Sequence, residues 1–223
     1  MLKHYPIILW DLDGTIINSY EGVTKSVQYA ASSFGIRLED PEILSRFIGP
    51  PLRESFPKYC GFNEEETERA VEKYRERYNP IGCYECRLYD GAQETIHAFR
   101  EDGRTQMLAS SKPEPMCRRI LEKFGIDREL DDIVGASMDG RIDTKIEVLN
   151  EVFRRLRQRG ADPDPEKIVL IGDTRFDVIG AKKAGIDCIG VSYGFGSDQE
   201  MIDCGAVTVC RDLKELKEKI LGS

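Results

Sequence analysis

The sequence Asp-Leu-Asp-Gly-Thr at residues 11–15 places two acids one residue apart, directly after the apolar run Ile7–Trp10. An apolar run of this length is typical of a strand buried on both faces, and ligands of open parallel sheets bind at the carboxyl ends of the strands. Asp11 and Asp13 would both project from such an end, where Gly14 lets the chain turn away sharply. Taken by itself, the segment could instead be an Asp-Gly turn that caps a helix.

A second acidic segment argues against the turn interpretation. Asp173 and Asp177 follow the apolar run Ile168–Ile171. If the two strands are neighbours, these acids converge with Asp11 and Asp13, although two like charges about 4 Å apart repel by roughly 4 kcal/mol at an effective dielectric of about 20. A divalent cation removes that cost. Because all the candidate ligands are oxygens, Mg²⁺ is favoured over zinc. Asp177 alone could also be a helix N-terminal acid.

A phosphate group would need hydrogen-bond donors at the same edge of the sheet. Ser110 and Ser111 follow another apolar run, and the backbone N–H groups of a helix that starts after Pro113 suit an anion. Lys145, at the start of a further predicted helix, is a second candidate. Taken singly, a serine pair before proline is a common N-cap and a lysine is commonly a solvated surface residue.

The elements that must position these residues follow an alternating pattern. Short apolar runs recur with helical patterns between them, such as those of residues 145–159 and 176–184, which indicates an α/β fold with a Rossmann-like parallel sheet. The predicted strands are Ile7–Trp10, Thr105–Ala109, Ile133–Ser137, Ile168–Ile171, Cys188–Val191 and Val207–Val209.

One interval interrupts this alternation. About ninety residues between the first and second predicted strands contain no convincing strand and are predicted to be helical, including Tyr20–Phe34 and a helix capped by Asn63. Since a connection from strand to helix normally needs only a few residues, we expect an inserted helical cap domain at residues 18–90, with the catalytic core formed by residues 1–17 and 91–223. A helical bulge without a role in binding is the alternative.

Composition restricts the class of protein. The 223 residues carry a formal net charge of −8, which argues against nucleic acid and anionic membranes as partners. Seven cysteines, an odd number, and the lack of a secretory signal or of a long apolar run favour reduced thiols in the cytoplasm. Cys83 and Cys86 could be half of a zinc site or a redox pair, but no second such pair exists and the only histidines are His4 and His97.

Together, these motifs resemble the haloacid dehalogenase superfamily of phosphotransferases over nearly the whole chain. Residues 11–15 look like its nucleophile motif, Ser110 like its second-motif hydroxyl, Lys145 like its third-motif lysine, and Asp173 with Asp177 like its acidic fourth motif. The helical interval resembles the helical cap of this family. Three stretches, residues 47–52, 180–186 and 193–197, resemble the phosphoglycolate phosphatase branch.

The resemblance implies a mechanism. Asp11 would attack phosphorus, while Asp13 would protonate the leaving oxygen and then activate water. Asp11, the backbone carbonyl of Asp13 and Asp173 would hold Mg²⁺ with support from Asp177, and Ser110 and Lys145 would neutralise the phosphoryl oxygens. The predicted substrate contacts are Gly14, Thr15 and Ser111 of the core together with Leu52 and Arg53, which we expect in a Pro-Pro turn between cap helices.

We therefore predict a Mg²⁺-dependent phosphatase for a small phosphorylated metabolite, such as phosphoglycolate or a nucleoside monophosphate. Asp13 argues against dehalogenation, and the lack of a cap histidine near Val23 argues against a β-phosphoglucomutase-like phosphotransferase, which is the main alternative. A non-catalytic phosphate-sensing module and an inactive scaffold are also compatible with the motifs. The sequence identifies neither the substrate nor the oligomeric state.

Overall fold

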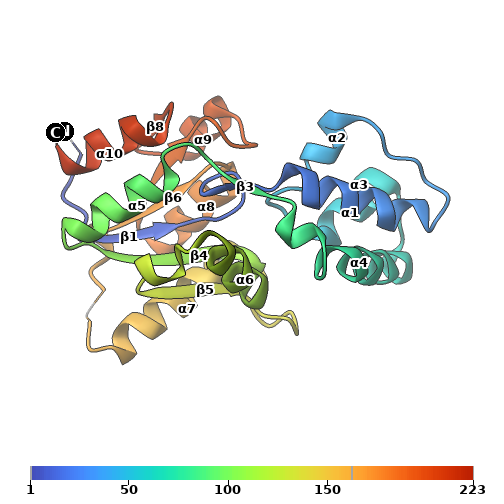
Figure 1. Cartoon of the computed structure of the whole chain (residues 1–223), viewed down its shortest axis with the longest axis horizontal. Coiled ribbons are helices and arrows are strands. Elements are labelled where there is room, and N and C mark those ends of the chain that lie inside the picture. Colours follow the sequence, from blue (N-terminus) through green and yellow to red (C-terminus); the bar gives the residue numbers. More distant parts are fainter. Residues whose placement is uncertain (1, 162, 223) are drawn as a thin grey trace. The chain divides into compact units, whose positions relative to one another are not determined.

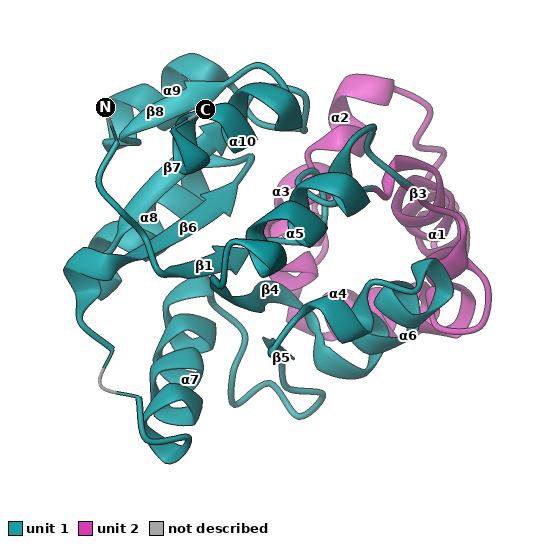
Figure 2. Ribbon diagram, turned by 60° about the vertical axis from the view of Figure 1, so that its left-hand side comes forward, with its two compact units in different colours: residues 1–17, 88–223 teal, residues 18–87 magenta. Residues whose placement is uncertain are grey.

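The computed structural model describes residues 2–161 and 163–222, and the chain divides into two compact units. Unit 1 comprises Met1–Ile17 and Leu88–Ser223, and unit 2 comprises Asn18–Arg87 (teal and magenta in Figure 2). The second boundary falls after residue 87 instead of residue 90. The cause is local, because the Tyr89 N–H donates a 3.0 Å hydrogen bond to the Ile16 carbonyl and so ties the returning chain to unit 1.

Unit 1 is built on a six-stranded sheet in the order β5-β4-β1-β6-β7-β8, in which every neighbouring pair is parallel (Figure 1). This confirms the predicted α/β class. The strand bounds agree with the sequence prediction to within one or two residues except for β4, which continues past Ala109. The strands are β1 (Ile7–Trp10), β4 (Thr105–Pro113), β5 (Asp132–Ala136), β6 (Ile168–Gly172), β7 (Asp187–Val191) and β8 (Thr208–Cys210).

Helices cover both faces of the sheet because each strand alternates its side chains between them. Leu9 packs with residues of α7 (Lys145–Gln158) and α8 (Arg175–Ala184) in one buried cluster. Trp10 stacks on Phe99 of α5 (Ala92–Glu101), with ring centroids 5.9 Å apart. The strands are therefore apolar on both faces. The remaining α-helices of unit 1 are α6 (Glu114–Phe124), α9 (Asp198–Cys204) and α10 (Leu213–Leu221).

The strand order determines which loops meet. From β1 the chain builds β4 and β5 on one side and then crosses back to build β6, β7 and β8 on the other. Trp10 is in register with Leu108 of β4 and with Ile171 of β6. The segments that follow these three strands therefore emerge side by side, at the switch point where ligands of open α/β sheets bind.

Unit 2 is helical, as predicted. Its α-helices are α1 (Tyr20–Ser32), α2 (Pro41–Ser45), α3 (Leu52–Cys60) and α4 (Glu64–Tyr78). Asn63 and Glu66 form the capping box that starts α4, and Phe47, Phe56 and Phe62 contribute to an aromatic core. Two short strands, β2 (Ile17–Asn18) and β3 (Arg87–Leu88), pair where the chain passes between the units.

The expected turn at Leu52 and Arg53 is wrong, because both residues lie in the first turn of α3. Pro51 occupies the N-cap position. The missing N–H of a proline costs nothing near a helix start, where backbone donors have no partner within the helix, so the Pro-Pro sequence starts this helix. Among the described residues, no helix has both the length and the apolar character needed to cross a membrane.

Candidate active site

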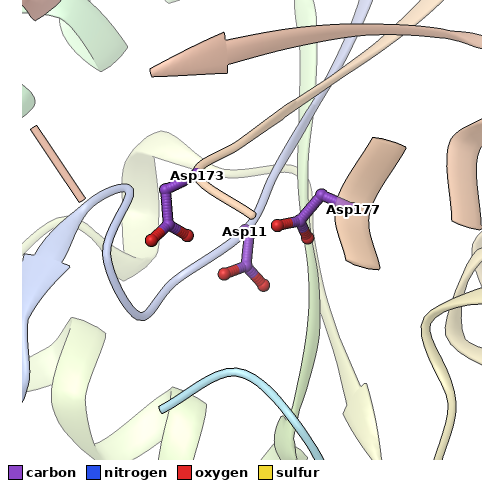
Figure 3. A group of neighbouring side chains, drawn as sticks. All are labelled: Asp11, Asp173 and Asp177. Carbon is purple, nitrogen blue, oxygen red and sulfur yellow. The ribbon is translucent and has the colours of Figure 1, made fainter. Parts of the chain in front are cut away.

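Three buried carboxylates converge at the carboxyl edge of the sheet. Asp11 follows β1, Asp173 follows β6, and Asp177 lies in the first turn of α8. One oxygen from each lies within 4.8 Å of the others, and Figure 3 shows the three side chains side by side, with Asp11 between Asp173 and Asp177. The predicted convergence of Asp11, Asp173 and Asp177 is thus present, while the carboxylate of Asp13 lies outside this group.

Glycines allow the backbone to approach Asp173 closely. Gly14 has a φ of 82°, and a Cβ at this position would collide with the Asp173 carboxylate. A Cβ at Gly194, in the loop after β7, would collide with the same side chain. In that loop the Phe195 N–H donates a 2.7 Å hydrogen bond to Asp173 Oδ2. The loop after β7 therefore fixes the Asp173 carboxylate, a role that no local pattern in the sequence indicated.

Asp177 is held by the start of its own helix. Its Oδ2 accepts hydrogen bonds from the Thr174 N–H at 3.0 Å and from Thr174 Oγ1 at 2.7 Å, which completes a capping box. Its Oδ1 lies 2.8 Å from Lys145 Nζ. Protein groups bind both oxygens of Asp177. The residue therefore caps α8 and is also part of the acidic site, so the two interpretations are compatible. This arrangement suits a supporting position better than direct coordination.

Lys145 connects three parts of the site. Its Nζ lies 2.6 Å from Asp11 Oδ1 and donates a 2.9 Å hydrogen bond to the Ala109 carbonyl at the end of β4, in addition to the pair with Asp177. The side chain reaches this position past α8, where a Cβ at Gly180 would lie 2.5 Å from Lys145 Cγ. The close approach of α7 to α8 at Gly180 therefore gives Lys145 its path into the site.

Burial dominates the electrostatics of these groups. Loss of solvation raises the pKa of Asp11 to about 6 although the Lys145 charge opposes the change, and it raises the pKa of Asp173 well above the ordinary range. For Lys145 burial favours the neutral amine, but the Asp11 and Asp177 charges outweigh it, so its pKa is raised and the lysine stays cationic.

The site carries an excess of negative charge. When ionised, the three carboxylates exceed the single Lys145 charge by two. A divalent cation would balance that excess. The converging donors are carboxylate oxygens, with no histidine or cysteine among them, and this donor set fits Mg²⁺.

Asp13 has different surroundings from Asp11. Its Oδ2 forms a 2.9 Å ion pair with Lys112 Nζ, and both side chains are largely buried. Its Oδ1 is buried and has no hydrogen-bond partner among the described residues. Lys112 was not among the residues predicted from the sequence. The sequence Ser-Ser-Lys-Pro follows the predicted strand, but no local sequence pattern indicates that its lysine reaches Asp13.

The predicted donors are present at the end of β4. Ser110 is buried, and its hydroxyl oxygen accepts a 3.3 Å hydrogen bond from the Lys112 N–H, while Ser111 is half-buried. Thr15 is fully buried, with its hydroxyl 3.5 Å from Asp173 Oδ1 and its carbonyl bound by the Tyr193 hydroxyl at 2.8 Å. The Thr15 side chain thus supports the acidic cluster, so a substrate contact of this residue would come from its backbone.

The two predicted cap contacts lie in unit 2. Leu52 is half-buried, and Arg53 is exposed. The Arg53 guanidinium forms a two-point ion pair with Glu68 of α4, with Nε–Oε1 and Nη2–Oε2 distances of 2.5 and 2.9 Å. A leaving group that binds Arg53 would compete with Glu68 for the same donors.

The chain is similar to known proteins in both sequence and structure. The family model described as haloacid dehalogenase-like hydrolase matches residues 8–191. A predicted phosphatase of Clostridium acetobutylicum superposes with a TM-score of 0.93 at 38% identity, covering 99% of this chain and 100% of that one.

Curated relatives are similar over nearly the whole chain. A 5'-nucleotidase of Pseudomonas aeruginosa is 40% identical over 96% of this chain and 95% of its own length. Tyrosine-protein kinase PtkA of Mycobacterium tuberculosis is 34% identical over 96% of this chain and 72% of its own. Phosphoglycolate phosphatase 1 of Pseudomonas aeruginosa is 26% identical over 94% of this chain and 78% of its own.

Proposed function

Because the chain belongs to the haloacid dehalogenase-like hydrolases, we propose that it is a Mg²⁺-dependent phosphatase that passes the phosphoryl group of a small phosphomonoester to Asp11 and then to water. The observation that carries this proposal is the position of Asp11, which lies within one buried group with Asp173, Asp177 and Lys145. A carboxylate nucleophile, an oxygen-rich site for a cation and a fixed ammonium group are the parts that phosphoryl transfer requires.

The roles of the residues follow from their contacts. Asp11 attacks phosphorus in line, and Lys145, which already binds Asp11 Oδ1, orients this nucleophile and attracts the phosphoryl oxygens. Ser110 donates its hydroxyl to the same group. Asp11, the carbonyl of Asp13 and Asp173 would hold Mg²⁺, with Asp177 in support. The bound cation would supply charge neutralisation for the incoming dianion.

Asp13 serves as the acid and base of the reaction. It protonates the leaving oxygen as the phosphoaspartate forms, and it then takes a proton from the water that attacks that intermediate. Its unpartnered Oδ1 supports this role, because a buried oxygen without a hydrogen bond is costly unless a partner arrives during turnover.

We propose nucleoside 5'-monophosphates as the first substrate class, since the relative at 40% identity is named a 5'-nucleotidase. Phosphoglycolate is the second class.

The similarity to a tyrosine-protein kinase makes transfer to a tyrosine hydroxyl an alternative for the second step. Mutase activity, phosphate sensing without turnover and an inactive scaffold are the competing hypotheses. A cytoplasmic site of action is part of the proposal, supported by the seven cysteines, which are free thiols in the structure.

The test is a panel of phosphomonoesters assayed with Mg²⁺ and with excess chelator. We expect phosphate release from at least one ester, loss of turnover in chelator, and a phosphoenzyme that hydroxylamine cleaves as an acyl phosphate. Asp11→Asn should lower kcat by at least about a thousandfold and abolish the phosphoenzyme, because an amide of nearly the same shape is a poor nucleophile. Asp203→Asn, at an exposed position of α9, is the matched control.

Three outcomes would contradict the proposal. Full turnover in chelator would exclude the Mg²⁺ site. Normal turnover rates in Asp11→Asn would exclude Asp11 as the nucleophile. A phosphoenzyme that transfers its phosphoryl group to a tyrosine peptide faster than to water would favour the kinase alternative.

A further inference from the structure

A second buried lysine lies at the proposed site and has no role in the mechanism above. Lys112, near the end of β4, is 9% exposed, and its Nζ lies 2.9 Å from Asp13 Oδ2. Lys145 pairs with Asp11 and Asp177. The two lysines therefore engage different acids, although both reach the same edge of the sheet.

An irregularity of β4 aims Lys112 at Asp13. Ser110 pairs with Gly135 of β5 and Pro113 pairs with Ala136, so that two residues of β4 are inserted without a partner in β5. Such bulges bend a strand and redirect a side chain, and they are frequent next to active sites. Lys112 is one of the two inserted residues.

Gly135 makes room for the bulge. A Cβ at this position would lie 2.6 Å from the Lys112 carbonyl oxygen and equally close to the backbone of Glu114. The Lys112 carbonyl also accepts a hydrogen bond from Cys117 Sγ at 3.4 Å, and its N–H donates to Ser110 Oγ. The backbone of Lys112 is therefore fixed on several sides, which helps to hold its ammonium group beside Asp13 Oδ2.

The ion pair restrains a carboxylate that would otherwise rotate. The terminal torsion of an aspartate is broad, so an acid held at neither oxygen presents both of them. Lys112 holds Oδ2 through the 2.9 Å ion pair, while Oδ1 stays buried and unpartnered among the described residues.

We propose that Lys112 is a positioning residue, which holds Asp13 by Oδ2 so that Oδ1 faces the leaving-group oxygen and later the attacking water. This proposal rests on the proposed phosphatase function. In the first step an Asp11 oxygen bonds to phosphorus, the phosphorus–oxygen bond of the ester breaks, and the leaving oxygen takes the proton from Asp13 Oδ1. In the second step Asp13 Oδ1 takes a proton from water. The water oxygen bonds to phosphorus and the phosphoaspartate bond breaks, which restores Asp11.

The test compares two substrates that differ in their need for a proton. The alkyl leaving group of a nucleoside 5'-monophosphate requires protonation, whereas p-nitrophenolate leaves unprotonated. Lys112→Met keeps an unbranched side chain that is only one atom shorter, and it removes the charged donor. We expect its phosphoenzyme-forming burst to slow by about tenfold to a hundredfold with the nucleotide and by less than about threefold with p-nitrophenyl phosphate, with the nucleotide KM almost unchanged.

A second variant guards against a folding defect in the first. Gly135→Ala displaces the bulge by crowding the backbone of Lys112 and Glu114 while it leaves the lysine side chain chemically unchanged, and it should reproduce the same contrast between substrates. Lys167→Met, at an exposed lysine, should behave as wild type. Thermal unfolding of each variant establishes that the compared proteins are folded.

Equal losses with both substrates, or a loss that falls on KM, would mean that Lys112 binds the phosphoryl group or supports only the fold, and the proposal would be overturned. An unchanged burst with the nucleotide would overturn it as well. In each of these cases wild-type turnover leaves the phosphatase function standing. If the wild-type protein hydrolyses no ester of the phosphomonoester panel, the proposed function fails and the role of Lys112 fails with it.

Discussion

Two aspartates separated by one residue acquire different surroundings in this protein. Asp11 meets a lysine and two further acids, whereas Asp13 meets a lysine alone and keeps one oxygen unpartnered among the described residues. The environment of a carboxylate sets whether it is suited to attack or to proton transfer. The division of labour that we propose for Asp11 and Asp13 therefore comes from their neighbours, since the residue type is the same.

The acidic cluster predicts an unusual effect of removing a charge. Burial raises the pKa of Asp173, so its contribution to stability is present below its ordinary pKa and is lost as the pH rises through the folded value. Asp173→Asn removes this penalty at pH 7, and the amide oxygen can still accept the Phe195 N–H. In chelator we expect the variant to melt higher than wild type, by about 2 to 4 °C for each kcal/mol gained.

Calorimetric or fluorescence melting with and without Mg²⁺ checks this prediction. Mg²⁺ should raise the melting temperature of wild type and leave Asp173→Asn almost unchanged, because the variant lacks a ligand. The cluster would not be a cation site if both proteins responded equally. A variant that is less stable than wild type in chelator would contradict the electrostatic argument.

Among the elements, the edge strand β5 shows how the sheet ends. The Ile133 carbonyl accepts hydrogen bonds from Arg118 and Arg155, at 3.1 and 3.2 Å, and Arg159 donates to the Asp131 carbonyl at 2.7 Å. Exposed edges with unpaired backbone groups invite pairing with other chains. Arginines from α6, from α7 and from the residue after α7 occupy these carbonyls and so cover the edge.

Carboxylates hold these arginines, which makes the network sensitive to acid. Burial opposes ionisation of Glu114, but its hydrogen bonds to Arg155 and Arg118 outweigh burial and lower its pKa, and hydrogen bonds from Arg154 and Arg155 lower the pKa of Glu151 to about 2. Groups with a lowered folded pKa stabilise the protein above their ordinary pKa of about 4.5, and this stability is lost as the pH falls toward 2.

Arg155→Leu should therefore destabilise the protein at pH 7 by about 1 to 2 kcal/mol, because Glu114 and the Ile133 carbonyl lose a partner that is partly exposed to solvent. The difference in the free energy of unfolding between the variant and wild type should shrink as the pH falls below about 4.5. Urea unfolding across pH 2 to 7 measures both effects. Arg141→Leu, at an exposed ion pair, is the control and should change stability by less than about 0.5 kcal/mol. A difference that stays constant with pH would contradict the electrostatic account.

For the molecule as a whole, the two units contain different sets of the candidate site residues. Every residue of the acidic site and both buried lysines belong to unit 1, whereas Leu52 and Arg53 belong to unit 2, which has an aromatic core of its own. We propose that unit 2 selects the leaving group and takes no part in phosphoryl transfer.

Arg53 offers a test of that separation. Arg53→Ala should lower kcat/KM for an anionic substrate such as phosphoglycolate by about tenfold to a hundredfold, equal to about 1.4 to 2.8 kcal/mol, and should change activity on p-nitrophenyl phosphate little. Arg46→Ala, which removes another exposed ion pair of unit 2, is the matched control. Equal losses on both substrates would mean that Arg53, through its pair with Glu68, supports only the fold of unit 2.

The sequence by itself determined the alternation of strands and helices in unit 1 and, for five of the six strands of its sheet, the strand bounds to within one residue. Strands buried on both faces must be apolar along their length, so β1 and β6 were visible as runs such as Ile7–Trp10, and the acids that follow them were visible as candidates. The absence of strands over the insertion predicted its helices. Lys145 was a candidate from its position at a predicted helix start, and the resemblance to a known family gave it a role; the family match confirms that resemblance.

Only the tertiary structure decided what these residues touch. Lys112 reaches Asp13 because β4 lies beside β1 and bulges where Gly135 leaves room, and neither the strand order nor the bulge has a local signature. For the same reason the burial of Thr15 was not predictable. The start of α3 at Leu52 was missed for a different reason, since a proline pair suits a turn as well as a helix N-terminus. Contacts between residues far apart in the chain depend on how the elements pack, which local pattern does not encode.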